Sequence, residues 1–362
     1  MNDLRTLIKE NIPLEIWKNG LENKKVVIFG TGGDGIRTYS MLRQYNIENI
    51  SFCDNNPEKW GKKVGQTESI CISITDIPKY SDAIFIIGTR NYVMPIAQQL
   101  KSLNVTFLTS DAYLFLREIN KLEEVYKIFL NSESQNVYYK LIETMVTGNF
   151  NIIPEIYSDK QYYAIPQFAM PKANDVFIDC GAYVGDSIEQ FINIRMGNFG
   201  KIFSFEPCSK QFNAMIKRRD RLISEWALEE DKITCIKAGL SDSKGEKYLD
   251  VCGSLGESFI NNKNDTTLDE KIEIISLDEY FKDFREHISF IKADIEGYEL
   301  KMLHGARNII QKDKPNLAIC IYHKFNDFFE IPLFIKTLVP EYKMEVRHHN
   351  FNLWETVLYC YI

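Results

Sequence analysis

Acidic residues follow three of the apolar segments in the second half of the sequence, where they could bind hydroxyl groups or a cation. Asp179 ends the first of these segments, Glu206 follows the second, and Asp294, Glu296 and Glu299 follow a later one. A carboxylate at the end of a strand can accept hydrogen bonds from both hydroxyls of a ribose, as the acidic residue of dinucleotide folds does. We therefore predict a ligand site here, with Glu206 as the ribose-binding residue, rather than a solvated loop.

A glycine-containing turn directly follows Asp179. Gly181 and Gly185 let the backbone turn sharply and approach a ligand closely, and the helix expected after them begins with free N–H groups. The turn contains no GKS or GKT sequence, so it is not a phosphate-binding P-loop. Its acidic residues, Asp179 and Asp186, would repel a pyrophosphate and suit a ligand that carries a cation or hydroxyl groups.

A hydroxyl acceptor would need a base, and histidine has the best-suited pKa. Of the five histidines, His304, His323, His348 and His349 could matter. His323 is the first choice because it follows the buried strand predicted at 317–321. His348 and His349 could instead shape the acceptor site, and a surface or capping role stays open for each histidine.

Asp294 is an alternative base, and with Glu296 it could hold a divalent ion that orients the acceptor. Two carboxylates are not a metal site by themselves, so a metal is possible but not expected. The eight cysteines contain no CxxC pair and no Cys/His spacing that suits zinc.

A second glycine turn occurs in the first half of the sequence. Gly30, Gly32 and Gly35 follow a predicted strand and precede a predicted helix, and Asp54 lies about twenty residues further on. This pattern is that of a dinucleotide-binding turn, but the segment is short for a full dinucleotide. Binding of a nucleotide-sugar, or a turn that only packs its helix, are the alternatives.

Apolar segments alternate with helical patterns in both halves, which predicts two doubly wound α/β domains. In the first half the predicted strands are 26–29, 50–53, 83–87 and 105–108. In the second half they are 176–179, 201–205, 233–236, 288–291 and 316–321, with a closing antiparallel pair at 344–347 and 355–360. We predict a small Rossmann-like domain over 1–115, a helical linker over 116–170 and a second domain over 171–362.

Charge and cysteine usage limit the partners and the compartment. The net charge of −7 and the pI of about 5.5 do not favour nucleic-acid binding. The basic residues Lys217, Arg218, Arg219 and Arg221 are interrupted by Asp220, which indicates a solvated helix face. The scattered cysteines indicate reduced thiols. Neither a signal peptide nor a membrane span is recognisable in the sequence. We therefore expect a cytoplasmic protein.

Residues 174–325 resemble the FkbM family of S-adenosylmethionine-dependent methyltransferases. The matching segments, in order, are DVFIDCGAYVGDS, FSFEP, KAGLSD with a glycine at 245, SLDEY, FIKADIEGYEL, LHGA and PNLAICIYH. The resemblance implies a seven-stranded class I methyltransferase fold for the second domain. The segment FCDNNP of the first domain is similar to the small Rossmann-like domain of some sugar-modifying acyltransferases and FkbM-type proteins.

The resemblance also implies roles for individual residues. Glu206 would bind the ribose hydroxyls of the cofactor, and Asp294 and Glu296 would lie near the sulfonium and the acceptor. The residues implied beside the methionine part, the ribose and the adenine are Asp179, Gly181, Ala182, Tyr183, Gly185, Asp186, Ser187, Pro207, Gly239, Leu240, Ser241 and Asp242.

These observations predict an O-methyltransferase that acts on a sugar or a sugar-bearing precursor of a surface polysaccharide or glycoconjugate. The sugar is implied by the family resemblance alone. The rival hypothesis is a non-catalytic protein, or one that binds NAD or a nucleotide-sugar through its first domain. Methylation of a protein or a nucleic acid is disfavoured, and the acceptor and the oligomeric state stay open.

Overall fold

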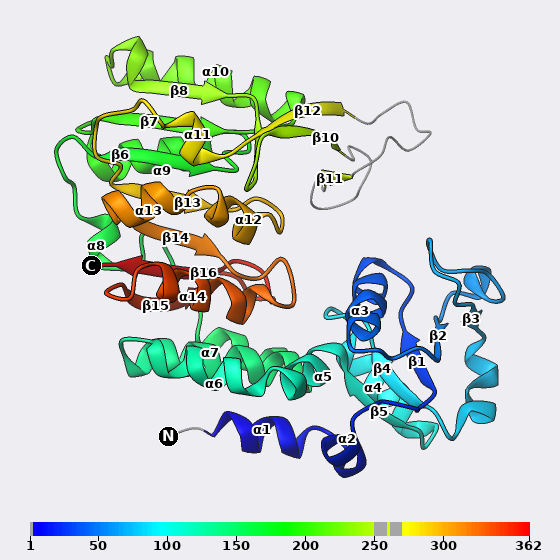
Figure 1. The fold of residues 1–362 in the computed structure, drawn as a ribbon. Coiled ribbons are helices and arrows are strands. Elements are labelled where there is room, and N and C mark those ends of the chain that lie inside the picture. Colours follow the sequence, from blue (N-terminus) through cyan, green and yellow to red (C-terminus); the bar gives the residue numbers. More distant parts are fainter. Residues whose placement is uncertain (1–2, 250–258, 261–269) are drawn as a thin grey trace. The chain divides into compact units, whose positions relative to one another are not determined.

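The computed structural model describes residues 3–249, 259–260 and 270–362 (Figure 1). The chain divides into two compact units. The N-terminal unit comprises residues 1–127, 135–156 and 351–353, and the C-terminal unit comprises residues 128–134, 157–350 and 354–362.

A five-stranded parallel sheet forms the centre of the N-terminal unit (Figure 1). Its order is β3-β2-β1-β4-β5, and every neighbouring pair is parallel. The strands are β1 (Val26–Phe29), β2 (Ile50–Cys53), β3 (Cys71–Ile72), β4 (Ile84–Ile87) and β5 (Thr106–Thr109). Every residue of β1 and β4 is buried, as in parallel sheets that are covered on both faces. The Rossmann-like arrangement is as predicted, and only the two-residue strand β3 was missed.

The helices of this part of the chain include segments that the sequence had suggested as a linker. They are α1 (Leu4–Glu10), α2 (Leu14–Asn19), α3 (Gly33–Gln44), α4 (Val93–Ser102), α5 (Ser110–Arg117), α6 (Ile119–Ile128) and α7 (Ser132–Thr147), with the 3-10 helices η1 (Pro57–Lys59), η2 (Ile74–Tyr80) and η3 (Phe150–Glu155). Of the expected linker, 116–170, residues 116–127 and 135–156 belong to the N-terminal unit, and residues 128–134 and 157–170 belong to the C-terminal unit. The apolar stripe of α6 is buried.

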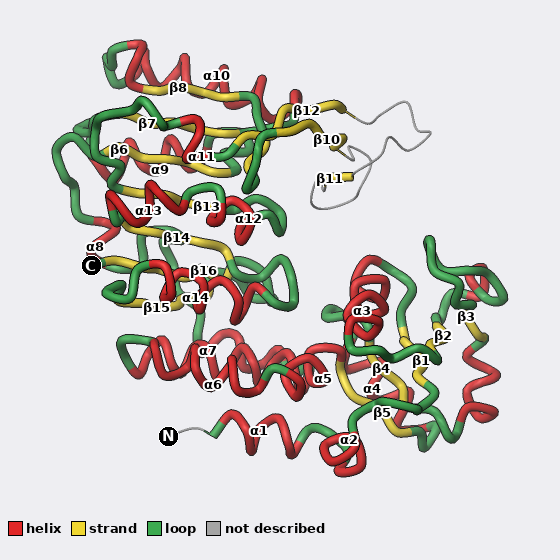
Figure 2. Tube along the Cα trace, in the orientation of Figure 1, coloured by secondary structure: helices red, strands yellow, loops and turns green. Residues whose placement is uncertain are grey.

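A seven-stranded sheet forms the centre of the C-terminal unit, as predicted (Figure 2). Its order is β15-β16-β14-β13-β6-β7-β8. The pairs from β14 to β8 are parallel, whereas β16 is antiparallel to both of its neighbours. The strands are β6 (Val176–Cys180), β7 (Lys201–Phe205), β8 (Ile233–Ile236), β13 (Phe290–Ala293), β14 (Asn316–Cys320), β15 (Lys343–His348) and β16 (Thr356–Tyr361).

Helices flank this sheet and bury its aromatic core. The helices are α8 (Pro166–Ala169), α9 (Asp186–Arg195), α10 (Ser209–Glu225), α11 (Leu277–Tyr280), α12 (Glu299–His304), α13 (Arg307–Asp313) and α14 (Asp327–Leu338), with the 3-10 helix η4 (Glu230–Lys232). Phe177 of β6 stacks on Phe191 of α9, with ring centroids 4.5 Å apart, and on Phe290 of β13 at 4.8 Å. Stacked rings contribute beyond their burial, so these contacts fix α9 against the sheet.

A small sheet in the order β11-β10-β12-β9 was not predicted. Its strands are β9 (Gly239–Leu240), β10 (Gly245–Leu249), β11 (Phe259–Ile260) and β12 (Glu270–Ile275). In β12, buried and exposed residues alternate between 271 and 274, which is typical of a strand with one covered face. The strands of this sheet are short and far apart in the sequence, so the pattern was weak.

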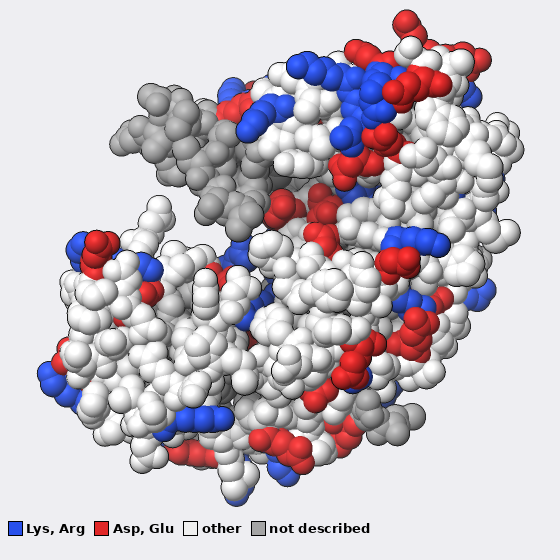
Figure 3. Space-filling model, turned by 180° about the vertical axis from the view of Figure 1, so that it is seen from behind, with Lys and Arg blue, Asp and Glu red and all other residues white. Residues whose placement is uncertain are grey.

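The basic residues of α10 are paired with acidic ones, as predicted for a solvated helix face. Arg221 contacts both Glu189 and Glu225, and Arg219 contacts Asp220. Figure 3 shows Lys and Arg atoms interleaved with Asp and Glu atoms at the end of the molecule where α10 lies.

Within the described part of the chain, no helix combines the length and apolar character that a membrane crossing requires. The seven cysteines for which the structure gives a state are free thiols. Cys252 lies outside the described residues.

Candidate active site

The sheet order brings the predicted acidic residues together. Strands β7, β6, β13 and β14 are direct neighbours and parallel, so their carboxyl ends meet at one edge. Asp179, Glu206, Asp294 and His323 lie in or just after these ends. Ligands of open α/β sheets bind at this edge.

Asp179 is fully buried and takes part in fixing the turn that follows it. Its carboxylate lies 3.1 Å from Lys292 Nζ, and the hydroxyl of Ser187 donates to it at 2.5 Å. Lys292 also donates to the carbonyl oxygen of Gly181 at 2.6 Å. Burial raises the pKa of Asp179 more than Lys292 and Ser187 lower it. The structure therefore gives Asp179 a role beneath the turn, where it positions the turn residues.

The turn requires glycine at position 181. Gly181 has a φ of +82°, and a Cβ atom there would lie 1.9 Å from the carbonyl oxygen of Asp294. The N–H groups of Gly181 and Ala182 donate to the carbonyl oxygen of Phe205 at 3.1 and 3.0 Å. The turn thus packs directly against the ends of β7 and β13. Of the predicted cofactor residues here, Tyr183 and Asp186 are exposed, whereas Ala182, Gly185 and Ser187 are buried.

Glu206 links the end of β7 to the same turn. One carboxylate oxygen accepts the N–H of Tyr183 at 2.9 Å, and the other accepts the N–H of Cys208 at 2.9 Å. A carboxylate oxygen has two lone pairs, so it can accept a hydroxyl group as well as an N–H group. Backbone N–H groups from the turn and from the residue after Pro207 thus hold the two oxygens of the carboxylate.

The residues implied beside the adenine lie at the small sheet. Gly239 and Leu240 form β9, and both are buried. Ser241 is buried and donates its N–H to Ile275 at 3.0 Å, whereas Asp242 is exposed. This segment follows β8 and is held to β12 by backbone hydrogen bonds.

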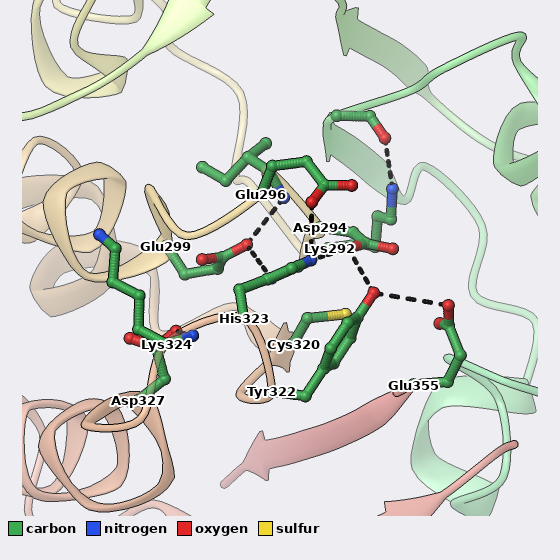
Figure 4. Close-up of polar contacts among 12 residues, drawn as sticks. Lys292, Asp294, Glu296, Glu299, Cys320, Tyr322, His323, Lys324, Asp327 and Glu355 are labelled. Carbon is green, nitrogen blue, oxygen red and sulfur yellow. Dashed lines mark hydrogen bonds and ion pairs between the residues drawn. The ribbon is translucent and has the colours of Figure 1, made fainter. Parts of the chain in front are cut away.

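Three carboxylates surround the ring of His323 (Figure 4). Nδ1 lies 2.9 Å from Glu299, and Nε2 lies 3.4 Å from Asp294 and 3.6 Å from Glu296. Glu299 is fully buried, and the side chain of His323 is 8% exposed, whereas that of Glu296 is 50% exposed. The sequence had pointed to Asp294, Glu296 and His323 but gave Glu299 no role of its own.

The carboxylates change the protonation of His323. Burial lowers the pKa of the ring, but Glu299, Asp294 and Glu296 together raise it to about 9. The ring therefore carries a proton at neutral pH and cannot accept another. The predicted role of His323 as the base would require that this proton first be lost.

Two tyrosines hold Asp294. The hydroxyl of Tyr162 donates to it at 2.8 Å, and that of Tyr322 lies 3.2 Å from its other oxygen. Burial raises the pKa of Asp294, but Lys292, His323 and the tyrosines outweigh it and the pKa is lowered. Tyr322 could have been noticed beside His323, but Tyr162 comes from the connection before β6 and had no local signal.

Glu355 extends this network from the start of β16. Its carboxylate lies 3.4 Å from the hydroxyl of Tyr322 and accepts a hydrogen bond from Gln161. Burial and the charge of Asp294 raise the pKa of Glu355. A carboxylate of raised pKa is a better proton acceptor, and the sequence analysis did not single this residue out.

His348 is not brought to this cluster. Its ring is fully buried in β15 and lies 2.8 Å from the hydroxyl of Thr356. His349 is bonded to the carbonyl oxygen of Ser158 at 2.7 Å and to the hydroxyl of Tyr359 at 2.8 Å. A contribution of either ring to the acceptor site stays a prediction.

In the N-terminal unit, Asp54 is bonded to its own glycine turn. It accepts the N–H and hydroxyl of Thr31 at 3.1 and 2.6 Å, and it pairs with Lys59 at 2.9 Å. A Cβ atom at Gly35 would lie 2.1 Å from the carbonyl oxygen of Gly30. By contrast, a Cβ atom at Gly32 would meet nothing within 4 Å. Asp54 thus stabilises the turn, and the nucleotide-binding role of the turn stays a prediction.

Comparisons with known proteins agree with this arrangement. Residues 179–353 match the methyltransferase FkbM domain, and residues 22–107 match the C2185-like N-terminal domain. A solved methyltransferase FkbM from Methylobacillus flagellatus KT is similar over 99% of this chain and 98% of its own, with a TM-score of 0.59 and 18% identity. An rRNA methylase from Streptococcus thermophilus covers 56% of this chain and 96% of its own, with a TM-score of 0.36 and 14% identity. No curated protein matches the chain.

The family match covers the strand ends, the glycine turn and the carboxylate cluster described above. The similarity to the solved structure extends over both units and agrees in fold. The C-terminal unit therefore contains a methyltransferase FkbM domain over residues 179–353, and the chain is an S-adenosylmethionine-dependent methyltransferase.

Proposed function

We propose that this methyltransferase acts on a hydroxyl oxygen of a sugar or of a sugar-bearing precursor. The observation that carries the proposal is the cluster of Asp294, Glu296, Glu299 and His323 beside the glycine turn after β6. Such a cluster can hold the hydroxyl groups of an acceptor, and Glu355, which joins it through Tyr322, can remove the proton that methylation of an alcohol releases.

The cofactor would lie across the ends of β6 and β7. Glu206 accepts the ribose hydroxyls, the turn from Gly181 to Asp186 borders the methionine part, and the edge after β9 borders the adenine. Asp294 lies where a sulfonium would benefit from a nearby negative charge, since opposite charges attract strongly in a partly dry site. Hydrogen bonds with Phe205 and Lys292 already fix the turn, so little conformational entropy would be lost when the cofactor binds.

In the reaction, the acceptor oxygen attacks the methyl carbon and the carbon–sulfur bond breaks. S-adenosylhomocysteine leaves, and the hydroxyl proton passes to a carboxylate. We assign that proton to Glu355, because its pKa is raised whereas that of Asp294 is lowered and His323 is already protonated. The leaving group is good, so the protein contributes mainly by positioning the two reactants.

A sugar acceptor is supported by two exposed aromatic side chains next to site residues. Tyr183 lies in the turn after β6 and is 58% exposed, and Trp354 directly precedes Glu355 and is 41% exposed. Aromatic faces of this kind can pack on the apolar face of a sugar ring while carboxylates bind its hydroxyls.

Calorimetric titration of the full chain with S-adenosylmethionine and S-adenosylhomocysteine tests the cofactor site. We expect both compounds to bind, and Glu206→Ala to weaken both by at least about tenfold, the worth of a charge-assisted hydrogen bond. Glu225→Ala, which removes an exposed carboxylate of α10, is the matched control and should bind as wild type does. Absence of binding by the wild-type chain would contradict the proposal.

The acceptor class is tested with methyl-labelled S-adenosylmethionine and a panel of nucleotide-sugars, free sugars and small phenols. Transfer of label to a sugar hydroxyl, lost in Glu355→Gln, supports the proposal. Label that appears only on phenols or on amines would overturn the sugar assignment and leave the methyltransferase itself unaffected.

A further inference from the structure

Several carboxylates lie around the ring of His323. Asp294, Glu296 and Glu299 face the ring, and the side chain of Asp327, which begins α14, is also buried. Lys292 is already paired with Asp179. Buried carboxylates are costly unless a cation compensates them, so the cluster has room for more positive charge.

Lys324 does not supply that charge. Its ammonium group donates to the carbonyl oxygen of Gly297, away from the ring of His323 (Figure 4). Its backbone N–H is the group that contacts Asp327, at 2.8 Å.

Unpaired polar atoms converge at the same place. Glu299 Oε1 accepts the N–H of Ile295 at 2.8 Å, but the fully buried Oε2 has no hydrogen-bond partner. Both ring nitrogens of His323 lie close to carboxylate oxygens, yet neither makes a hydrogen bond of acceptable geometry. Buried polar atoms normally make hydrogen bonds, so the Oε2 atom of Glu299, beside two ring nitrogens that have ion-pair contacts but no well-aligned hydrogen bond, points to a missing partner.

One ligand atom each from Asp294, Glu299 and His323 lies within 4.8 Å of the others, which a single ion could bridge after small rotations. These three side chains are placed by rigid elements. Asp294 directly follows β13, Glu299 begins α12, and His323 follows β14, the strand beside β13. Tyr162 and Tyr322 orient the Asp294 carboxylate, as partners behind a metal ligand commonly do.

We propose that Asp294, Glu299 and His323 bind a divalent metal ion in exchange for a proton of the His323 ring, with Mn²⁺ or Mg²⁺ as the class that two carboxylates and one imidazole suit. The half-exposed Glu296 marks the open side, where water or the acceptor hydroxyl would complete the coordination. That role of the ion rests on the proposed function. The bound hydroxyl would be more acidic, lose its proton to Glu355, and attack the methyl carbon as the carbon–sulfur bond breaks.

The test is a titration of the chelator-treated full chain with Mn²⁺, in which free Mn²⁺ is measured by electron paramagnetic resonance. We expect one ion per chain and a loss of affinity of more than about tenfold in both His323→Ala and Asp294→Asn. His304→Ala is the control, because this ring packs on Phe334 rather than in the cluster, and it should bind Mn²⁺ as wild type does.

Circular dichroism of the same samples shows that each variant is folded, and S-adenosylhomocysteine binding separates the two proposals. Glu206→Ala should lose S-adenosylhomocysteine but keep Mn²⁺. A wild-type chain that binds S-adenosylhomocysteine but no Mn²⁺ overturns the metal site and leaves the proposed function standing. Binding of Mn²⁺ that folded His323→Ala and Asp294→Asn retain in full also overturns the site.

Discussion

At the scale of single residues, the acidic side chains of the site already make hydrogen bonds and ion pairs with other residues of the chain. Asp179 is neutralised by Lys292, and Glu206 is bonded to backbone N–H groups on both sides. Asp294 is held by two tyrosines. Carboxylates fixed in this way present their remaining lone pairs in defined directions, which favours a site that is formed before its ligand binds.

Gly181→Ala should damage this arrangement more than other glycine substitutions. The new Cβ would lie 1.9 Å from the carbonyl oxygen of Asp294, and the φ of +82° is unfavourable for alanine. We expect a loss of about 1–3 kcal/mol of unfolding free energy and weaker S-adenosylhomocysteine binding, measured by denaturant unfolding and calorimetry. Gly245→Ala, where a Cβ would meet nothing within 4 Å, is the control and should change neither. Equal effects of the two substitutions would contradict the close approach.

His349 should make the stability depend on pH. Burial, with a smaller effect of Arg347, lowers the pKa of its ring from the usual 6.5 to about 4. As the pH falls below 6.5, the unfolded chain binds a proton that the folded chain does not, so stability is lost between about pH 6.5 and 4.

At pH 5 this loss amounts to about 2 kcal/mol relative to pH 8. Urea unfolding at the two pH values, for wild type and His349→Gln, measures it. The variant should be less stable at pH 8 but should lose less on acidification. His287→Gln, at an exposed histidine, should follow wild type, and an unchanged pH dependence in His349→Gln would show that the ring is not the titrating group.

At the scale of elements, the position of the turn depends on how α9 is held against the sheet. Phe191 of α9 stacks on Phe177 of β6, which in turn stacks on Phe290 of β13. The strands that carry Asp179 and Asp294 are thus joined by one aromatic stack as well as by backbone pairing. The core and the site share these strands, so damage to the stack should reach the site.

Phe177→Ala should therefore cost about 3–5 kcal/mol of unfolding free energy, as other deletions of buried aromatic rings do. Thermal and denaturant unfolding measure the loss, and S-adenosylhomocysteine affinity should fall with it. Phe351→Ala removes a ring that is 64% exposed and should stay within about 0.5 kcal/mol of wild type. A Phe177→Ala chain as stable as wild type would mean that the stack contributes little.

At the scale of the whole molecule, each unit has its own sheet with parallel central strands and its own glycine turn. In the C-terminal unit the acidic residues after the turn come from several strands. In the N-terminal unit Asp54 is bonded to Thr31, Asn56 and Lys59. The two turns share a sequence pattern but differ in what their acidic residue contacts.

Substitution of Asp54 should separate the two units functionally. Asp54→Ala removes the hydrogen bonds that close the N-terminal turn, so unfolding of this unit should begin at a lower temperature in calorimetric scans. S-adenosylhomocysteine affinity should stay as in wild type, because the predicted cofactor residues all belong to the C-terminal unit. A loss of affinity comparable to that of Glu206→Ala would contradict this separation.

The parallel strands of both sheets could be predicted from the sequence, because unbroken apolar runs such as 26–29 and 83–87 are typical of strands that are buried on both faces. The sequence also determined that acidic residues follow these strands, since the two features are local. It missed the small sheet, whose strands of two to six residues pair across distant segments.

Only the tertiary structure decided what those residues contact. Tyr162, Glu299 and Glu355 come from a connection, a helix start and the last strand, and no spacing in the sequence relates them to Asp294. Only the fold could show that Asp179 is neutralised by Lys292 and that His323 is surrounded by carboxylates. The physical reason is that burial and the charge of neighbours set the protonation of a side chain, and both depend on residues far away in the sequence.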